Sequence, residues 1–173
     1  MTPSKRVAVG WWIAGLIAFG IVIWMSMPLE IKDVPGGIID HQKAPDAGTV
    51  NTIQRYWREA GLLATARNAM IGDLVFIGIY GLGSLLCGLY FRARQQVVLR
   101  ALGWSAIVAA LLYLASDYGE TIAQIIQLVN FAGNDDLAHL ASTLQPIKVA
   151  AWIGTFLAVI LALIAEWLSS RAH

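Results

Sequence analysis

Long runs of hydrophobic residues dominate the chain and separate shorter polar segments. The runs cover approximately residues 9–29, 70–91, 101–122 and 149–168. A helix needs about 20 largely apolar residues to cross the hydrocarbon core of a bilayer, because each residue adds only about 1.5 Å. The pattern therefore predicts an all-α, integral membrane bundle of four transmembrane helices. We expect one membrane domain over residues 1–173, with external segments at 30–69 and 123–148.

The first external segment contains an amphipathic pattern, for which we expect a helix over residues 49–68 that begins at a Thr49 cap. Its apolar positions recur at helical spacing, at Val50, Ile53, Trp57, Ala60 and Ala64. Its polar side carries Asn51, Gln54, Arg55, Arg58 and Glu59. This helix either lies in the outer interface with Tyr56 and Trp57 at headgroup depth, or packs over the outer ends of the bundle. Both arrangements bury the same face.

The third hydrophobic run keeps its helical pattern beyond the expected membrane boundary, as far as Val129. One helix over residues 101–130 would be about 45 Å long, which exceeds the roughly 30 Å hydrocarbon core. We therefore expect it to protrude outward or to bend near Gly119. A turn at 133–136 and a short helix at 137–140 follow, and Pro146 is expected to introduce the fourth span.

Composition supports the membrane interpretation and excludes some functions. The chain is 58% hydrophobic and 13% charged, whereas soluble domains carry about 25% charged residues. The net charge of +1 argues against a nucleic-acid partner, which requires a strongly basic face. The single cysteine, Cys87, cannot form an internal disulfide, so a disulfide-relay enzyme is also excluded.

Basic residues near the span ends predict the orientation. Lys5 and Arg6 precede the first span, and the short connector between spans two and three carries Arg92, Arg94 and Arg100 without an acid. By the positive-inside rule, both termini are cytoplasmic and the two long connections face outward. Basic residues are equally numerous on the two sides, six against six, but ten of the eleven acids lie on the outer side. We expect a multi-pass protein of a bacterial inner membrane.

Three carboxylates fall near the outer ends of the spans, where ionisable groups are costly and need a partner or a function. Counted from the inner boundary, Asp73, Asp117 and Glu120 all rise about 25–30 Å, to the outer edge of the hydrocarbon. Asp117 and Glu120 belong to a stripe of polar residues whose heptad-like spacing places them on one face of a helix. The stripe consists of Tyr113, Asp117, Glu120, Gln124 and Gln127, and the matching face on span two holds Asp73, Phe76 and Tyr80. We expect both faces to point toward the bundle interior.

The acidic residues allow three interpretations. They pair with Arg58, Arg67 or Lys148 and tie the external segment to the bundle, or they bind a divalent metal with help from His41 or His139, or they line an outward-facing pocket. Spacing for a catalytic zinc or di-iron site is lacking, and no predicted span contains a histidine or a lysine, so neither metal nor cofactor is expected. The candidate ligand-binding residues are Asp73, Phe76, Tyr80, Tyr113, Asp117, Glu120, Gln124 and Arg67.

The preferred function is binding of a membrane lipid or an amphipathic small molecule in this pocket, or support of a membrane complex. A homo-oligomer or a complex partner is compatible with the small-residue pair Ser84 and Gly88. The competing function is a membrane enzyme that uses Asp117 or Glu120 as general acid or base on a lipophilic substrate. A transporter is less favoured, because no internal repeat and no charge near the bilayer midplane is visible.

The order of several motifs resembles a loose group of bacterial four-span inner-membrane proteins of unassigned function. The motifs are Trp57-Arg58-Glu59-Ala60-Gly61, Ala66-Arg67, Asp73-x-x-Phe76-x-x-x-Tyr80 and Asp117-x-x-Glu120. The resemblance covers about residues 50–125 and implies the four-span fold but no activity. It is imperfect at Thr121, where such relatives place asparagine. The architecture also resembles the four-span sterol isomerase group, which has acidic residues in a lipid-binding cavity, although no motif of that group maps onto this chain.

Overall fold

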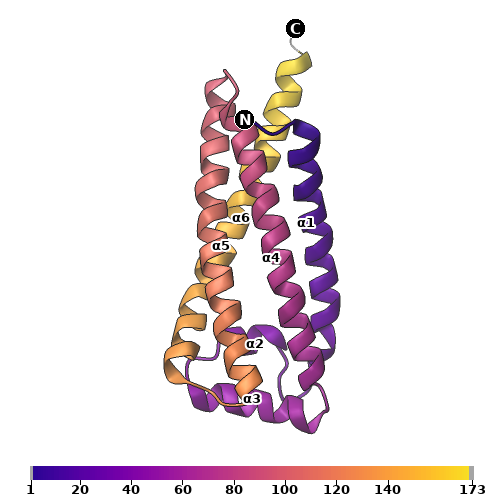
Figure 1. Ribbon diagram of the computed structural model, residues 1–173, viewed down its shortest axis with the longest axis vertical. Helices are drawn as coiled ribbons and strands as arrows, with labels where there is room; N and C mark the ends of the chain where they lie inside the picture. The colour runs from indigo at the N-terminus through magenta and orange to yellow at the C-terminus, as the bar shows by residue number, and fades with distance from the viewer. Residues whose placement is uncertain (1, 172–173) are drawn as a thin grey trace.

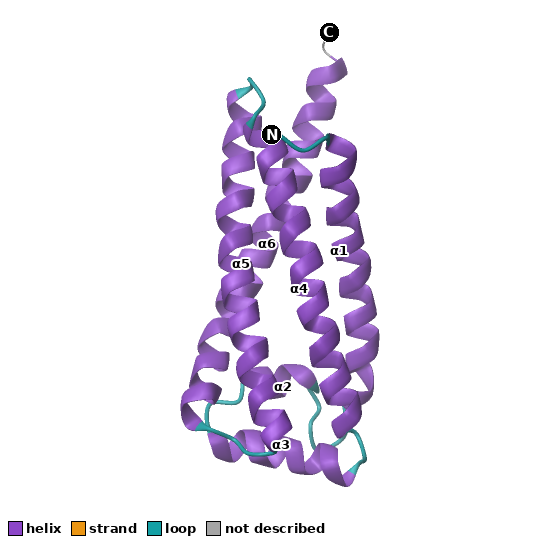
Figure 2. Cartoon of the chain, viewed as in Figure 1, coloured by secondary structure: helices purple, strands orange, loops and turns teal. Residues whose placement is uncertain are grey.

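The computed structural model describes residues 2–171, and its regular structure is helical apart from one isolated bridge between Ile31 and Val34. Its elements are α1 (Lys5–Ser26), η1 (Met27–Leu29), α2 (Ile38–Gln42), α3 (Ala47–Glu59), α4 (Leu63–Arg92), α5 (Val97–Asn130) and α6 (Asp135–Arg171). Four of them, α1, α4, α5 and α6, are long and apolar enough to cross a membrane. The chain is therefore a multi-pass, all-α membrane protein, as the hydrophobic pattern predicts (Figures 1 and 2).

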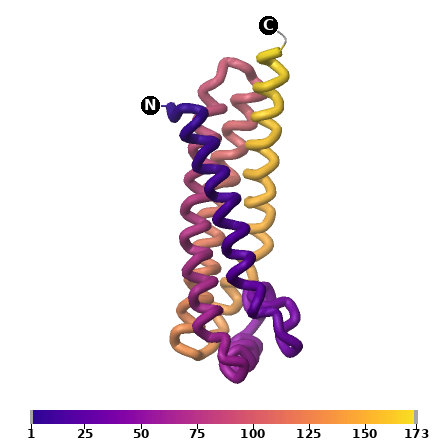
Figure 3. Tube along the Cα trace, turned by 90° about the vertical axis from the view of Figure 1, so that its right-hand side faces the viewer, coloured from indigo at the N-terminus to yellow at the C-terminus, as the bar shows by residue number. Residues whose placement is uncertain are grey.

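Each of the four long helices packs on the long helix that precedes or follows it in the chain, so the bundle has the order α1, α4, α5, α6. α4 lies between α1 and α5, and α6 packs on α5. The first and last of these helices, α1 and α6, meet mainly through large aromatic side chains. Phe19 and Trp152 have ring centroids 5.1 Å apart, and Trp12 and Phe156 are 5.7 Å apart. Figure 3 shows α1 crossing beside α6. The α1–α6 seam is therefore closed by side chains rather than by close backbone contact.

Small residues let the backbones of α1, α4 and α5 approach closely. A Cβ atom added to Gly15 of α1 would lie 2.6 Å from the Tyr80 Cα, and one on Gly83 of α4 would lie 2.6 Å from the Trp12 backbone nitrogen. On the other side of α4, a Cβ on Gly88 would lie 2.9 Å from the Gly103 carbonyl oxygen. The glycine-rich second span is therefore the centre of the bundle.

Replacing Gly15 with alanine is expected to destabilise the bundle by about 2 kcal/mol, because the new methyl group meets backbone atoms that cannot move without separating α1 from α4. Gly10 and Gly20 lie on the same helix, and a Cβ atom added to either would have no neighbour within 4 Å, so their alanine variants are matched controls. Alanine at these two positions is expected to be neutral or to stabilise by up to about 1 kcal/mol. Unfolding of the three variants in mixed micelles of increasing SDS fraction measures the difference. Equal stabilities would contradict close α1–α4 packing.

Helices α2 and α3 cover the end of the bundle opposite the termini, and Figure 1 shows α3 running across this end. The apolar face of α3 is buried against protein, with Val50, Ile53 and Trp57 at 1%, 7% and 0% exposure. The Trp57 indole nitrogen donates a hydrogen bond to the Leu29 carbonyl oxygen at 3.1 Å. Of the two expected arrangements, α3 therefore adopts the one that packs over the bundle. Trp57 is therefore buried in protein rather than exposed to lipid, and its depth relative to the headgroups stays a prediction.

Several expected boundaries differ from those observed. The expected helix over 49–68 is two helices, because Gly61 adopts a left-handed backbone conformation with φ of 72° after α3 ends, and α4 already begins at Leu63. Asp46, not Thr49, caps α3 by accepting the Thr49 N–H at 2.7 Å. Pro146 does not start the fourth span but lies inside the continuous helix α6. By contrast, α5 extends to Asn130 as expected.

Candidate functional site

A buried lysine joins the two carboxylates of α5 to α6. The Lys148 ammonium nitrogen lies 2.9 Å from Asp117 Oδ1 and 2.9 Å from Glu120 Oε1. The side chains of Asp117 and Glu120 are only 4% and 0% exposed, and that of Lys148 is 12% exposed. The Gln124 side-chain amide donates a further hydrogen bond to Glu120 Oε1 at 2.8 Å. The interpretation of the acids as partners of a cation is therefore confirmed for Asp117 and Glu120, with Lys148 as the cation.

The third carboxylate, Asp73, lies on the neighbouring helix α4 and has a different environment from Asp117 and Glu120. The Thr121 hydroxyl of α5 donates a hydrogen bond to Asp73 Oδ2 at 3.0 Å. Over residues 2–171, no lysine, arginine or histidine nitrogen lies within 4.0 Å of the Asp73 carboxylate. Asp73 is therefore a partly buried carboxylate that is bound by a hydroxyl but not by a cation.

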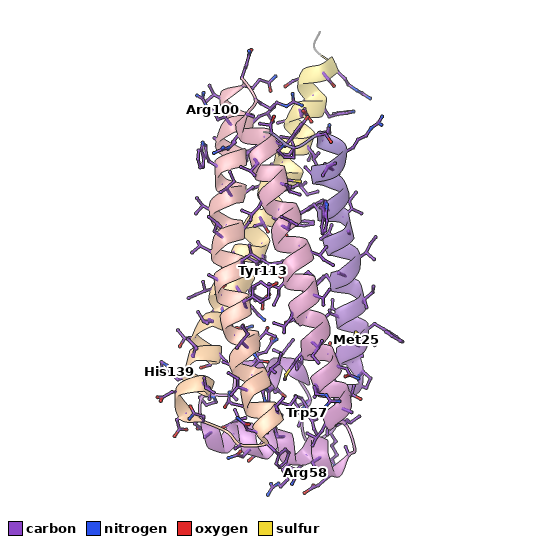
Figure 4. The ribbon with its side chains drawn as sticks, in the orientation of Figure 1. Met25, Trp57, Arg58, Arg100, Tyr113 and His139 are labelled. Carbon is purple, nitrogen blue, oxygen red and sulfur yellow. The ribbon has the colours of Figure 1, made fainter. Side chains whose placement is uncertain are left out.

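Aromatic side chains form the floor next to these charges. The rings of Tyr113 and Tyr80 pack edge to face with centroids 5.3 Å apart, and Phe76 lies 6.2 Å from Tyr113. The Tyr80 hydroxyl is 2.7 Å from the Thr155 hydroxyl. The Tyr113 hydroxyl, in contrast, is buried without a hydrogen-bond partner among the described residues. Figure 4 shows the Tyr113 ring between α4 and α5, so a buried polar atom lies unsatisfied in the interior.

A cavity of about 500 Å³ lies between α1 and α6 and reaches these residues. Helix α2 lines it at the end nearer the cap through Ile38, Ile39 and Gln42. Its side walls include Ile23, Val149 and Ile153, which are 46%, 41% and 45% exposed. Its remaining lining consists of Phe19, Val22, Ser26, Met27, Glu30, Gly36, Asp73, Phe76, Tyr113, Asp117, Gln145, Lys148 and Trp152. The cavity is thus apolar toward the side of the bundle and charged at its inner wall.

The structure brings together most of the residues that the sequence predicted for the site. Asp73, Phe76, Tyr113 and Asp117 line the cavity. Tyr80 packs behind Tyr113, and Glu120 and Gln124 are buried behind Lys148. Arg67 is exposed and does not line the cavity. Arg58 pairs with no acid among the described residues and instead lies over the Phe131 ring, 3.3 Å from its centroid.

Other residues of the site were not predicted from the sequence. They include the wall residues of α1 and α2 and several residues of α6, among them the aromatic side chain of Trp152. Trp152 stacks on Tyr80 with a centroid separation of 5.9 Å and packs in a tilted arrangement against Phe19 at 5.1 Å. Its place near the end of a span is typical of a membrane-interface tryptophan. The signal that it belongs to the site is its position four residues, one helical turn, after Lys148.

The structure does not bring together the ligands of the alternative metal site. No group of three or more histidine, cysteine, aspartate or glutamate side chains in residues 2–171 is arranged to hold a metal. The Lys148 ammonium occupies the position between Asp117 and Glu120. Of the two histidines considered as additional ligands, His139 is exposed on α6 and His41 is buried in the cap.

His41 belongs to a separate polar contact between α2 and α3. It is 1% exposed, its ring stacks on Trp57 at 5.3 Å, and its Nε2 lies 3.3 Å from the Gln54 amide nitrogen. Burial lowers the pKa of His41 to about 4, although the polar side chain of Gln124 acts in the opposite direction. Gln54 was expected on the solvent side of its helix, but it is fully buried because it pairs with His41.

Comparison with protein-family models, curated proteins and solved structures finds no match for this chain. The fold and the cavity therefore define only its class, a four-helix membrane bundle with a partly charged cavity between two of its helices, next to the cap of α2 and α3.

Proposed function

We propose that this protein binds a membrane-dissolved amphiphile in the cavity between α1 and α6. In the bound state, the polar head lies against Asp73 and Asp117, and the alkyl chain passes between α1 and α6 toward the lipid. The observation that carries the proposal is the cavity itself, which joins a charged inner wall to exposed apolar residues of two membrane helices. Its volume of about 500 Å³ lies within the roughly 300–1,000 Å³ that is typical of small-molecule sites.

Asp73 and the hollow distinguish this function from a purely structural role of the charges. Ion pairing accounts for Lys148, Asp117 and Glu120, since these three groups satisfy one another. It does not account for Asp73, which has no cationic partner in the described chain, or for the unsatisfied Tyr113 hydroxyl. Asp117 and Glu120 were the candidate general acid and base of an enzyme, but both are held by Lys148. Binding without catalysis is therefore the simpler function.

The proposed location is a bacterial inner membrane with both termini in the cytoplasm. The end of the bundle that carries the termini also carries Lys5, Arg92, Arg94 and Arg100, and the opposite end carries the cap of α2 and α3 (Figure 1). The positive-inside rule places the basic end in the cytoplasm. The cavity then opens in the outer half of the membrane, directly beneath the external cap.

Filling the cavity tests the proposal. We expect Val149→Trp to block binding, because Val149 is a cavity wall residue that is also 41% exposed and so accommodates a larger side chain. The matched control is Leu157→Trp, eight residues along α6, where the side chain is 50% exposed and outside the cavity lining. Both variants add the same side chain to the same membrane helix, so general effects of tryptophan are equal.

The measurement is photolabelling in nanodiscs that contain a long-chain alcohol with a diazirine in its alkyl chain. Peptide mass spectrometry is expected to locate the label on the residues of α1 and α6 that line the cavity. Val149→Trp is expected to reduce this labelling about tenfold, which corresponds to about 1.4 kcal/mol of binding free energy, and Leu157→Trp to leave it unchanged. Uniform labelling of the lipid-facing surface in all three proteins would overturn the proposal.

A further inference from the structure

We infer that the cavity selects an amphiphile with a cationic head, an ammonium or quaternary ammonium group, which is held by the Asp73 carboxylate. This inference rests on the proposed function, because it specifies the ligand of the same cavity. Three observations support it: the balance of charged groups on the cavity wall, the availability of Asp73, and the aromatic surfaces with an unpartnered hydroxyl beside it.

The charged groups that line the cavity are predominantly acidic. They are three carboxylates, Glu30, Asp73 and Asp117, and one ammonium, Lys148. The ammonium is not free to bind a ligand, because Asp117 and Glu120 both lie 2.9 Å from it. An anionic head would therefore enter a region of like charge without a free cation to pair with, whereas a cationic head would be attracted to the carboxylates.

Asp73 is the carboxylate that can accept this head. Its single hydrogen-bond donor among the described side chains is the Thr121 hydroxyl, which binds Oδ2. Oδ1 is left for a ligand, and charge-assisted hydrogen bonds from an ammonium are shorter and stronger than neutral ones. The pair would form in a partly buried site, where screening by water is weaker than at the protein surface.

The aromatic side chains around Asp73 also favour a cationic ligand. Phe19, Phe76, Tyr113 and Trp152 all line the cavity, and aromatic faces attract ammonium groups, especially quaternary ones. The Tyr113 hydroxyl adds an independent sign of a missing ligand. Tyr113 is 1% exposed, its hydroxyl has no partner in the described chain, and the residue contributes to the cavity wall. This oxygen can accept a hydrogen bond from a bound ammonium.

The test compares photoreactive probes that share one C16 chain and differ only in the head, which is trimethylammonium, primary ammonium, hydroxyl or sulfonate. Each is added at low mole fraction to nanodiscs of zwitterionic lipid, and the labelling of cavity peptides is divided by that of the lipid-facing peptide around Leu157. We expect the two cationic probes to label the cavity about tenfold more than the sulfonate probe. Labelling by the alcohol is expected to lie between that of the cations and that of the sulfonate.

Asp73→Asn is expected to lower cation labelling to the level of the alcohol and to leave alcohol labelling unchanged. Asparagine keeps the size of the side chain and an oxygen for the Thr121 hydroxyl, so the variant is expected to fold, which its SDS unfolding curve verifies. The control is Asp136→Asn, which removes an exposed acid at the same end of the bundle, outside the cavity. It is expected to retain the wild-type preference.

The outcomes separate the inference from the proposed function. Equal labelling by all four probes, or stronger labelling by the sulfonate, would overturn the cation preference while the cavity remained a binding site. A cation preference that persists in Asp73→Asn would overturn the role of this carboxylate. Absence of cavity labelling by every probe would overturn both the inference and the function on which it rests.

Discussion

Replacing Lys148 with methionine is expected to destabilise the folded bundle by about 3–5 kcal/mol, the typical cost of removing one partner from a buried ion pair. The Asp117 and Glu120 side chains are 4% and 0% exposed, and both depend on the Lys148 ammonium at 2.9 Å. Methionine preserves the length and the apolar stem of lysine but removes the charge. Two carboxylates would then lie buried beside each other without a cation. Unfolding in mixed micelles of increasing SDS fraction, followed by tryptophan fluorescence, measures the loss.

The matched control is Lys5→Met at the end of the bundle that carries the termini. Lys5 also pairs with a carboxylate, Glu166, but its side chain is 49% exposed. Glu166 retains the Arg94 guanidinium at 2.7 Å and the Tyr90 hydroxyl at 2.6 Å when Lys5 is removed. The expected loss is below about 1 kcal/mol, as for other exposed pairs. Equal losses in the two lysine variants would show that burial does not determine the effect.

Neutralising the acids is expected to rescue the Lys148 variant. In Lys148→Met combined with Asp117→Asn and Glu120→Gln, no uncompensated charge remains in the interior. Most of the stability lost in the single variant should therefore return. If the triple variant is no more stable than Lys148→Met, the loss comes from packing of the lysine stem rather than from its charge.

The sequence predicted the parts of the fold that follow from periodic hydrophobicity. The four long apolar helices, the continuation of α5 to Asn130 and the inward-facing stripe from Tyr113 to Gln127 all follow from patterns that repeat over several turns. A repeated pattern specifies both a helix and its buried face. The shared level of Asp73 and Asp117 also followed from counting residues along two antiparallel helices, and both residues line one cavity.

Features that depend on a single backbone angle or on distant contacts were not predicted. The φ of 72° at Gly61 ends α3, but a glycine in a sequence does not reveal which angle it adopts. Pro146 is a usual helix start, yet it is tolerated within α6, as prolines in membrane helices often are. His41 and Gln54 are buried because two short helices, α2 and α3, contact each other. The hydrophobic pattern of either helix alone does not predict this contact.

The sequence also did not reveal which cation pairs with Asp117 and Glu120. Arg67 lies six residues before Asp73 on α4, which turns it about 240° around the helix axis at 3.6 residues per turn. It is exposed, whereas Lys148 reaches the acids from a helix 31 residues away in sequence from Asp117. Helical geometry alone could have removed Arg67 from the candidates. Selecting Lys148 required knowing that α6 packs on α5.

Lowering the pH is expected to loosen the cap formed by α2 and α3, because His41 is buried in its neutral form. Burial lowers the pKa of His41 from 6.5 to about 4, so the unfolded cap binds a proton at a higher pH than the folded cap. Stability is therefore complete above about pH 6.5 and falls as the pH decreases toward 4. The difference of about 2.5 pH units corresponds to about 3 kcal/mol at most. Hydrogen exchange of the α2 and α3 amides between pH 7 and pH 4 measures this loss.

His41→Gln isolates the contribution of the histidine from that of the carboxylates, which also take up protons in this range. Glutamine retains an amide that can bond to Gln54 but cannot be protonated, so the cap of this variant should lose much less stability between pH 6.5 and 4. His139→Gln removes an exposed histidine of α6 and is expected to keep the wild-type profile. Since Gln42, adjacent to His41, lines the cavity, loosening of α2 would also open the outer wall of the site. A wild-type pH profile in His41→Gln would show that another group governs the cap.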